Sequence, residues 1–358
     1  MKKRILFLAP YPEGEAPSQR FRFEQYYSCL REAGFEVHFQ SFWDQRAWQV
    51  LYRPGAWGAK LLGMLRGFVR RLTLLWRARR YDFVFVHREV APIGPPFFEW
   101  WISKILNKRL VYDFDDAIWL PNTSQQNRIA AFLKWHSKVK HICRYAYKIS
   151  VGNDYLAAFA RQWNTNVVVI PTTIDTGYHR PDGQKKPDSS KPVVLGWTGT
   201  HSTLPYLQTI APVLWKLAEA HPIKVRVICN VAPDFELPSL EFVPWSKERE
   251  IEDLQTIDIG LMPLIEDAWA KGKCGFKALQ YMALEIPPVV SPVGVNTRIV
   301  AHGQRGFWAH SSAEWLHYLE LLVKDAALRA RFGAEGRRFV EQHYSVHAHQ
   351  MSVVRLFA

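Results

Sequence analysis

Short apolar runs alternate with stretches of helical spacing through the first half of the chain. The run at 4–9 is followed by 18–33, where Phe21, Tyr26, Cys29 and Leu30 recur near helical spacing, and then by a run at 36–40. This order predicts a β-strand, a helix and a second strand, the start of a parallel sheet covered by helices. Further strands are predicted at 83–86, 110–114, 148–151 and 167–170.

A second α/β series follows a polar connection rich in Pro, Gly, Ser, Asp and Lys at 176–191. A helix is predicted at 204–220. Beyond 313 only helix is expected, and its last part, 334–357, is long enough to lie across both halves. The second set of predicted strands is 193–196, 225–229, 241–243, 257–262 and 288–290. The domain boundaries predicted from these patterns are 1–176, a linker at 177–191, 192–335, and a C-terminal helix at 336–358 that packs back on the first domain.

Composition limits the class and the partners. A chain of 358 residues with 48% hydrophobic residues suits two globular domains. The formal net charge of +13 requires an anionic partner, which is nucleic acid, a phosphorylated ligand or acidic lipid. Four dispersed cysteines, an apolar start that ends at Pro10, and no uncharged stretch of spanning length predict a cytoplasmic protein, soluble or peripheral on a membrane.

Two glycine-containing segments of the second half are candidates for binding a diphosphate. PVVLG runs into Gly196–Thr200, with Ser202 placed to cap the next helix, and backbone N–H groups at such a junction suit an anion. The segment 271–277, KGKCGFK, gathers three cations and two glycines before the helical LQYMA. The alternatives are a glycine turn without a ligand and an exposed basic loop.

Six blocks of the chain, in order, resemble the family-4 retaining glycosyltransferases, which have the GT-B fold. They are RFRFEQYYSCLREAGFEV, VIPTTID followed by HRP, GWTGTHSTLPYL, GFKALQYMALEIPPVVSPVGVN, HGQRGFW and FGAEGRRFVEQHYS. VYDFDDAIWLP also resembles a signature of one bacterial branch. The resemblance implies two Rossmann-like domains with a cleft between them, an N-terminal domain for the acceptor and a C-terminal domain for a nucleotide sugar, UDP- or GDP-linked, with no cofactor and no metal. The expected donor residues are Gly196, Thr198, Gly199, Thr200, His201, Lys273, Gly275, Phe276, Lys277, Gln280 and Asn296.

The chain departs from the family pattern at the donor site. Two glutamates separated by seven residues are usual there, and alignment places Gly272 and Gln280 at their positions. An amide at Gln280 would hydrogen-bond a ribose hydroxyl without the charge of a carboxylate. The usual Arg and Lys after the strand are replaced by Thr200, His201 and Ser202, so His201 and the nearby lysines would have to bind the diphosphate.

Three aspartates, Asp113, Asp115 and Asp116, follow a predicted strand, and Asp115 lies where the family often has a histidine. Strand alternation would put Asp116 on the opposite face from the other two. We expect Asp115 and Asp116 to be catalytic, binding sugar hydroxyls or accepting the proton of the acceptor. The alternative is that they bind loop N–H groups or cap a helix, and a metal site at the Asp-x-Asp pattern is a lesser one.

Three more residues are candidates for binding the acceptor. His87 ends another predicted strand, and Arg20 and Arg22 follow the first strand and its loop, where they would bind an anionic acceptor such as a pyrophosphate-linked lipid. The alternatives are that His87 has a structural role and that Arg20 and Arg22 lie in the solvated start of a helix.

The segment 60–80, KLLGMLRGFVRRLTLLWRARR, predicts a basic amphipathic helix. Leu61, Leu65, Phe68, Leu72, Leu75 and Trp76 gather on one side, and Arg66, Arg70 and Arg77 on another. Such a helix suits the headgroup layer of an anionic membrane. The alternative is a helix that packs its apolar side on the core. Nucleic acid does not account for the apolar side, and no nucleic-acid-binding motif accompanies it.

These observations predict a glycosyltransferase of polysaccharide or cell-envelope biosynthesis at the inner face of the cell membrane, with a lipid-linked or glycan acceptor. The rival prediction is a GT-B protein that binds a nucleotide sugar or a partner without transferring sugar, which the missing glutamate pair favours.

Overall fold

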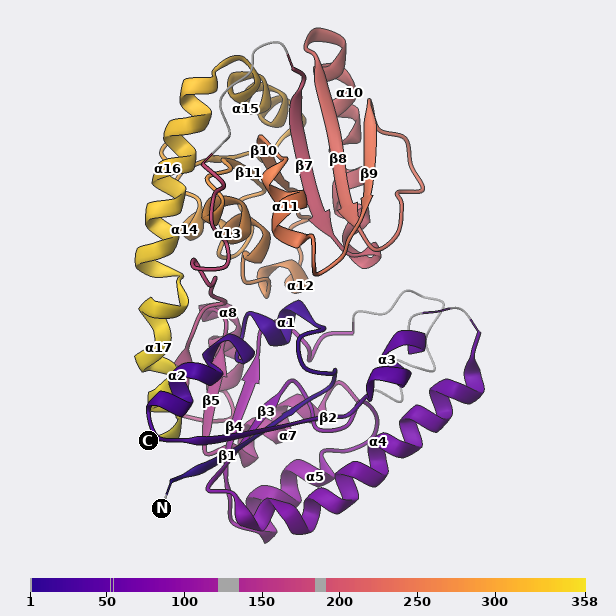
Figure 1. The fold of residues 1–358 in the computed structure, drawn as a ribbon, viewed down its shortest axis with the longest axis vertical. Coiled ribbons are helices and arrows are strands. Elements are labelled where there is room, and N and C mark those ends of the chain that lie inside the picture. Colours follow the sequence, from indigo (N-terminus) through magenta and orange to yellow (C-terminus); the bar gives the residue numbers. More distant parts are fainter. Residues whose placement is uncertain (1, 52, 54, 122–134, 184–190) are drawn as a thin grey trace. The chain divides into compact units, whose positions relative to one another are not determined.

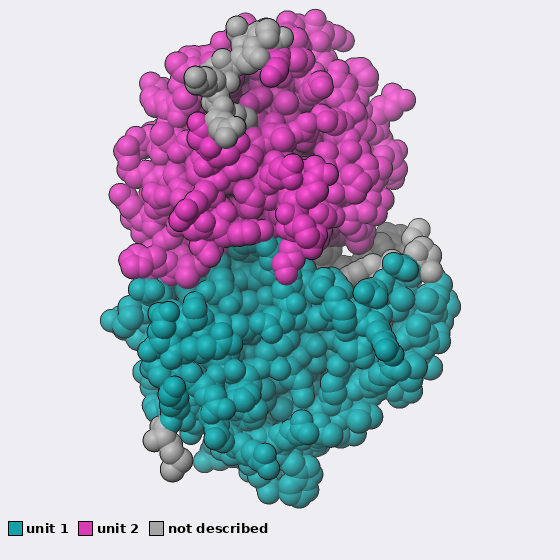
Figure 2. Space-filling view, in the orientation of Figure 1, with its two compact units in different colours: residues 1–172, 349–358 teal, residues 173–348 magenta. Residues whose placement is uncertain are grey.

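The computed structural model describes residues 2–51, 53, 55–121, 135–183 and 191–358. The chain forms two compact units, coloured separately in Figure 2. Unit 1 contains residues 1–172 and 349–358, and unit 2 contains 173–348. The predicted linker falls in unit 2, and its part at 184–190 lies outside the described residues.

Unit 1 is built on six parallel strands in the order β2-β1-β3-β4-β5-β6 (Figure 1). The strands are β1 Arg4–Ala9, β2 Glu36–Ser41, β3 Phe83–His87, β4 Arg109–Phe114, β5 Lys148–Val151 and β6 Val167–Val169. Parallel strands that are buried on both faces consist mainly of apolar residues, as β1 and β3 do here.

Helices connect these strands. They are α1 Pro17–Arg20, α2 Tyr27–Glu32, α3 Gln45–Leu51, α4 Trp57–Arg77, α5 Phe97–Trp100, α7 Lys138–Tyr145 and α8 Asp154–Arg161, with 3-10 turns at Glu24–Tyr26 and Ala78–Arg80 and a π-helical turn at Trp101–Ile105. The end of the chain completes this core, because the Phe357 ring packs 5.9 Å from that of Phe7 and 5.6 Å from that of Phe83.

Unit 2 has a second parallel sheet, in the order β12-β11-β10-β7-β8-β9. Its strands are β7 Val193–Gly199, β8 Ile223–Cys229, β9 Leu240–Pro244, β10 Ile259–Met262, β11 Pro288–Val290 and β12 Phe307–Trp308. Its helices are α9 Leu204–Gln208, α10 Ala211–Ala220, α11 Glu250–Gln255, α12 Ala268–Lys271, α13 Phe276–Ala283, α14 Asn296–Ile299, α15 Ser312–Lys324 and α16 Ala326–His343. The helix α17, Val346–Val354, begins in unit 2 and continues into unit 1, followed by a 3-10 turn at Arg355–Phe357.

Each sheet has one point at which successive strands stop adding to one side of the sheet and begin to add to the other. In unit 1 this point lies between β1 and β3, and in unit 2 between β7 and β10. Open α/β sheets bind ligands outside the carboxyl ends of the strands at such a point. The two carboxyl edges are therefore where functional side chains are expected.

The predicted helix at 18–33 is wrong in one respect, because the structure breaks it into α1, a 3-10 turn and α2. The Gln19 side chain exchanges hydrogen bonds with the backbone of Tyr11, and Glu24 accepts one from the Gly14 N–H at 2.9 Å. These side chains hold the loop after β1, and the backbone between them leaves the helical path. The short edge strand β12 was not predicted, since two residues carry no periodicity.

Among the helices of the described residues, none is both long and apolar enough to cross a membrane.

Candidate functional site

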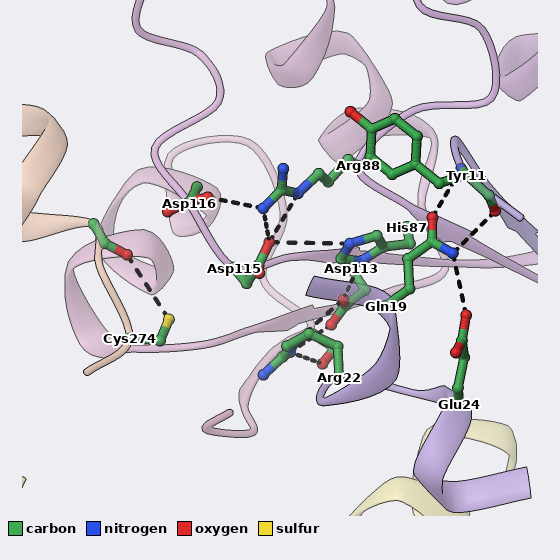
Figure 3. A network of polar contacts seen from close by, with 12 residues as sticks. Tyr11, Gln19, Arg22, Glu24, His87, Arg88, Asp113, Asp115, Asp116 and Cys274 are labelled. Carbon is green, nitrogen blue, oxygen red and sulfur yellow. Dashed lines mark hydrogen bonds and ion pairs between the residues drawn. The ribbon is translucent and has the colours of Figure 1, made fainter. Parts of the chain in front are cut away.

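A buried ion pair organises the carboxyl edge of unit 1. Asp113, at the end of β4, accepts from the Arg22 guanidinium at 2.5 Å and from His87 Nδ1 at 2.8 Å (Figure 3). Burial alone would raise the pKa of Asp113, but the charge of Arg22 and the bond from His87 hold it well below its usual range. An ionised carboxylate only accepts hydrogen bonds, so His87 Nδ1 carries a proton.

That bond fixes the orientation of the His87 ring. The imidazole is fully buried, and its Nε2 lies 4.0 Å from a carboxylate oxygen of Asp115, with no hydrogen-bond partner among the described residues. An aspartate that holds one ring nitrogen and leaves the other directed at a second group is an arrangement suited to proton transfer.

Asp115 and Asp116 both contact the guanidinium of Arg88. Arg88 donates to Asp115 Oδ1 from Nε at 2.9 Å and from a terminal nitrogen at 2.8 Å, and to Asp116 Oδ2 at 2.8 Å (Figure 3). Burial would raise the pKa of Asp115, but Arg88 and then His87 lower it. The Asp115 carboxylate is therefore held as an anion.

Arg88 follows β3 directly and has a left-handed backbone, with φ of +62°. Residues other than glycine adopt this conformation at a cost of about 1–3 kcal/mol, and such residues cluster at functional sites. Its backbone is held by the Asp113 carbonyl, which accepts from the Arg88 N–H at 2.7 Å, and by the Tyr112 hydroxyl, which donates to the Arg88 carbonyl at 2.8 Å. The strain aims the guanidinium at Asp115 and Asp116.

A small cavity of about 60 Å³ lies at the point of reversal between β1 and β3. Its lining comes from both strand ends and from the start of α7: Pro10, Tyr11, Arg88, Glu89, Ile118, His136, Lys138 and Val139. Lys138 is paired with Glu89 at 2.7 Å, so the cavity contains an ion pair besides the Arg88 cluster.

The structure sorts the predicted residues of unit 1 into two groups. Asp115, Asp116 and His87 are brought together, whereas the guanidinium of Arg22 is buried against Asp113, the Ser150 hydroxyl and the Ile170 carbonyl. These contacts favour a structural role for Arg22 over the predicted binding of an acceptor. Arg20 stacks on the Phe21 ring at 5.0 Å and is partly exposed.

The prediction that Asp116 faces away from Asp115 is wrong. Since β4 ends at Phe114, strand alternation no longer applies beyond it, and one guanidinium contacts both carboxylates. Among the described residues no cluster of three metal-ligating side chains forms.

In unit 2 the prediction of a glycine turn at Gly196 is also wrong. β7 continues to Gly199, and Gly196 is buried within it, where a Cβ atom would come 2.2 Å from the Ile257 side chain. Glycine is needed there for packing, not for a ligand. The Thr198 N–H donates to the hydroxyl of Tyr281 at 3.1 Å and is thus already occupied.

The turn after β7 begins at Thr200. Thr200, not Ser202, caps the following 3-10 turn, in a reciprocal arrangement with Thr203. The His201 N–H donates to Asn230 Oδ1 at 2.9 Å, and its ring lies 3.3 Å from the Asn230 amide nitrogen. This links the ends of β7 and β8, and leaves His201 exposed at the carboxyl edge.

Lys277 lies in the first turn of α13, with its amine 4.5 Å from the centre of the buried Trp197 ring on β7. Burial, and secondly the positive charge of Lys273, lower the pKa of Lys277 to about 7. Among the described residues no carboxylate pairs with this amine, so its charge is balanced only by the ring face.

Gly275 begins α13 with φ of +69°, and a Cβ there would meet Ile299 at 2.2 Å. Next to it, the Asn296 amide donates to the Ser291 carbonyl at 2.9 Å, while Asn296 Oδ1 is buried without a partner among the described residues. Gln280 is buried on α13.

Lys273 and Phe276 complete the predicted donor residues. Lys273 lies 5.5 Å from the Trp269 ring centre, and Phe276 is half-buried at the start of α13. The structure thus brings the predicted donor residues to the ends of β7 and β11 and the start of α13, with Gly196 as the exception.

Residues 235–339, all within unit 2, match the family model of glycosyl transferases group 1. This segment includes Lys277 and the whole of α13. The chain is a glycosyltransferase with the GT-B fold. Comparison with curated protein sequences gives no match.

Solved structures of the same fold cover nearly the whole chain. Sucrose-phosphate synthase from Thermosynechococcus elongatus superposes with a TM-score of 0.72 at 14% identity, over 99% of this chain and 98% of that one. Anabaena Alr3699/HepE in complex with UDP and glucose gives 0.65 at 16% identity over 99% of both chains. A glycosyltransferase from Rickettsia africae ESF-5 gives 0.66 at 10% identity, over 99% of this chain and 98% of that one. At these identities the likeness establishes the fold.

Sequence reasoning did not single out Arg88 or Tyr281. The Tyr281 hydroxyl contacts β7 at the Thr198 N–H and β10 at the Leu261 carbonyl, across the point of reversal. Tyr281 is four residues from Lys277 on α13, so helical spacing places both on one face. Arg88 adjoins the predicted His87, but its left-handed backbone leaves no signal in the sequence.

Substitution of Asp113 and Asp115 separates the structural from the functional carboxylate. Asp113→Asn leaves the Arg22 charge buried without a counter-charge and should destabilise unit 1 by roughly 3–5 kcal/mol. Asp115→Asn, the matched control, retains Arg88 paired with Asp116 and should change stability much less. Thermal unfolding of both variants measures this, and equal melting temperatures would contradict the assignment.

Proposed function

We propose that this glycosyltransferase moves a sugar from a UDP- or GDP-linked donor to a lipid-linked or glycan acceptor, with retention at the anomeric carbon and without a cofactor. The reaction would take place at the inner face of the cell membrane. Retention and the family-4 assignment rest on the ordered sequence blocks. The observation that carries the donor assignment is the Lys277 amine on Trp197 at the carboxyl edge of unit 2.

The chemistry of this edge supports an anionic donor. Lys273, which precedes α13, lowers the affinity of Lys277 for a proton, and no carboxylate of the described residues pairs with Lys277. A diphosphate would supply the missing counter-charge and would restore the proton of Lys277. HepE, which has the same fold, is described in complexes with UDP and with UDP-glucose.

The donor site would work without the glutamate pair of the family. Lys277 and the exposed His201 would stabilise the charge that develops on the leaving diphosphate. Asn296 Oδ1, which is buried without a partner among the described residues, would accept from a donor hydroxyl or amide. Gln280 would offer an amide where a carboxylate is usual.

In unit 1, the Asp115 cluster would bind the acceptor. Asp115 is the accessible end of a chain of contacts that runs from Arg22 through Asp113 to His87. Held as an anion by Arg88, it would orient an acceptor hydroxyl and receive its proton as the glycosidic bond forms.

A panel of UDP-, GDP-, ADP- and CMP-sugars tests the proposal by thermal shift and by product formation. We expect a raised melting temperature with one nucleotide class, because ligand binding stabilises the native state by mass action, and transfer or slow hydrolysis of that donor. Asp115→Ala should lower turnover by about a hundredfold and leave donor affinity nearly unchanged. Tight donor binding without transfer or hydrolysis would instead make the chain a nucleotide-sugar-binding protein.

The pH dependence of donor affinity tests Lys277 itself. Because its lowered pKa is about 7, the amine is charged at about pH 6 and mostly neutral at about pH 8.5. Donor affinity should fall roughly tenfold over this range. Calorimetric titration should find that Lys277→Arg binds independently of pH and that Lys277→Met binds weakly throughout.

The matched control is His201→Gln, which removes the exposed imidazole from the same edge and leaves Lys277 in place. This variant should keep the pH profile of the wild type. If the pH dependence of donor affinity persists in Lys277→Met, or disappears in His201→Gln, then Lys277 does not bind the donor.

A further inference from the structure

The long helix α4 packs on unit 1 through small residues and an arginine. Its buried residues are Gly63, Gly67, Arg71, Leu74 and Ala78, the last in the 3-10 turn that follows. A Cβ at Gly63 would come 2.6 Å from Ala47, and one at Gly67 would come 2.6 Å from the Phe42 ring. The two glycines let the helix backbone lie directly on its neighbours, so the larger apolar residues are not used for packing.

Arg71 attaches α4 to the edge of the sheet. It is fully buried and donates to three backbone carbonyls, those of Ala9 at 3.1 Å, Gln40 at 3.2 Å and Val90 at 2.9 Å. Ala9 and Gln40 lie at the ends of β1 and β2, and Val90 lies in the loop after β3. The helix is thereby fixed to the same edge that carries the Arg88 cluster.

The opposite face of α4 is apolar and exposed. Seven large residues on it have exposed fractions between 47% and 79%: Trp57, Leu61, Leu62, Leu65, Val69, Leu72 and Trp76. In monomeric proteins contiguous apolar patches of this kind mark sites of interaction with proteins or membranes. The alternative of a helix with its apolar side packed on the core is therefore wrong.

The apolar surface extends beyond α4 onto α5, which lies beside it in Figure 1. The rings of Phe68 and Phe98 are 6.4 Å apart, and that of Phe97 is 5.7 Å from Phe98. Phe97, Trp100 and Ile105 are exposed by 42%, 37% and 49%. We call these exposed residues of α4, α5 and the π-helical turn the α4–α5 face.

The charges of α4 itself have one sign. Residues 45–81 contain no aspartate or glutamate, and the side chains of Arg66, Arg77, Arg79 and Arg80 are exposed. Arg66 and Arg77 lie on one border of the apolar stripe by helical spacing. Asp44 lies 4.0 Å from Arg66, but a symmetric contact between two copies of α4 would still bring an excess of arginines together, which disfavours a second copy as the occupant.

We propose that the α4–α5 face inserts into the headgroup layer of a bilayer that contains anionic lipid. The apolar residues of α4, together with Phe97 and Trp100, would lie among the upper acyl chains, while the arginines bind lipid phosphates. This proposal rests on the membrane location given in the proposed function, and it adds α5 to the surface that contacts the membrane. Because Arg71 ties α4 to the carboxyl edge, docking would hold the Asp115 cluster at a fixed height for a lipid-linked acceptor.

Cosedimentation of the full chain with vesicles tests the proposal without donor or acceptor. We expect binding to vesicles of phosphatidylcholine with about one-third phosphatidylglycerol, weak binding to phosphatidylcholine alone, and loss of binding at high salt. Val69→Glu and Trp100→Glu should each lower the partition coefficient by about tenfold or more, the first testing α4 and the second α5. Trp215→Glu in unit 2 is the matched control, because Trp215 is exposed by 44%, and it should bind like the wild type.

Melting temperatures of the three variants should equal that of the wild type, since all three side chains are exposed. Unchanged vesicle binding in Val69→Glu would overturn the proposal. So would concentration-dependent dimerisation in the absence of lipid that Val69→Glu abolishes, because the face would then bind a second copy. Transfer to a water-soluble acceptor should be retained in Val69→Glu, so loss of docking is distinguishable from failure of the proposed reaction.

Discussion

The buried ion pair between Arg22 and Asp113 is the constraint on which the candidate acceptor edge depends. Two charges removed from water are stable only if each is paired and hydrogen-bonded, and here His87 and Ser150 complete the set. The pair fixes the end of β4 against the segment after α1, and through Asp113 it fixes the tautomer and direction of His87. Asp115 and Asp116, two and three residues further along the chain, both accept hydrogen bonds from Arg88.

In unit 2 the charged group at the carboxyl edge is a lysine and not an ion pair. Lys277 is half-buried against Trp197, with another lysine nearby and no carboxylate partner among the described residues. Such a charge is costly in the absence of an anion, so the same residues that weaken the free state favour a diphosphate ligand. The group 1 match covers this segment, and the sheet order places it beside the point of reversal between β7 and β10.

The sequence was sufficient for the architecture, which brings most of the candidate residues to the carboxyl edges of the two sheets. Apolar runs at 4–9, 148–151 and 288–290 coincide with β1, β5 and β11 because buried parallel strands have few polar residues. The sequence was insufficient where hydrogen bonds of side chains determine the path of the backbone. This is the case at Gln19 and Glu24, where the first predicted helix is interrupted. Periodicity also found the apolar stripe of α4 without showing which face is packed, since that depends on Gly63 and Gly67 fitting against Ala47 and Phe42.

Hydrogen–deuterium exchange with a saturating nucleotide sugar tests the central claim most directly, because it locates the donor without any substitution. We predict slower exchange at 199–203 and at 273–280 in unit 2, with α4 unchanged in the absence of lipid. Protection confined to unit 1, or unchanged exchange at both segments of unit 2 while the donor is bound, would contradict it.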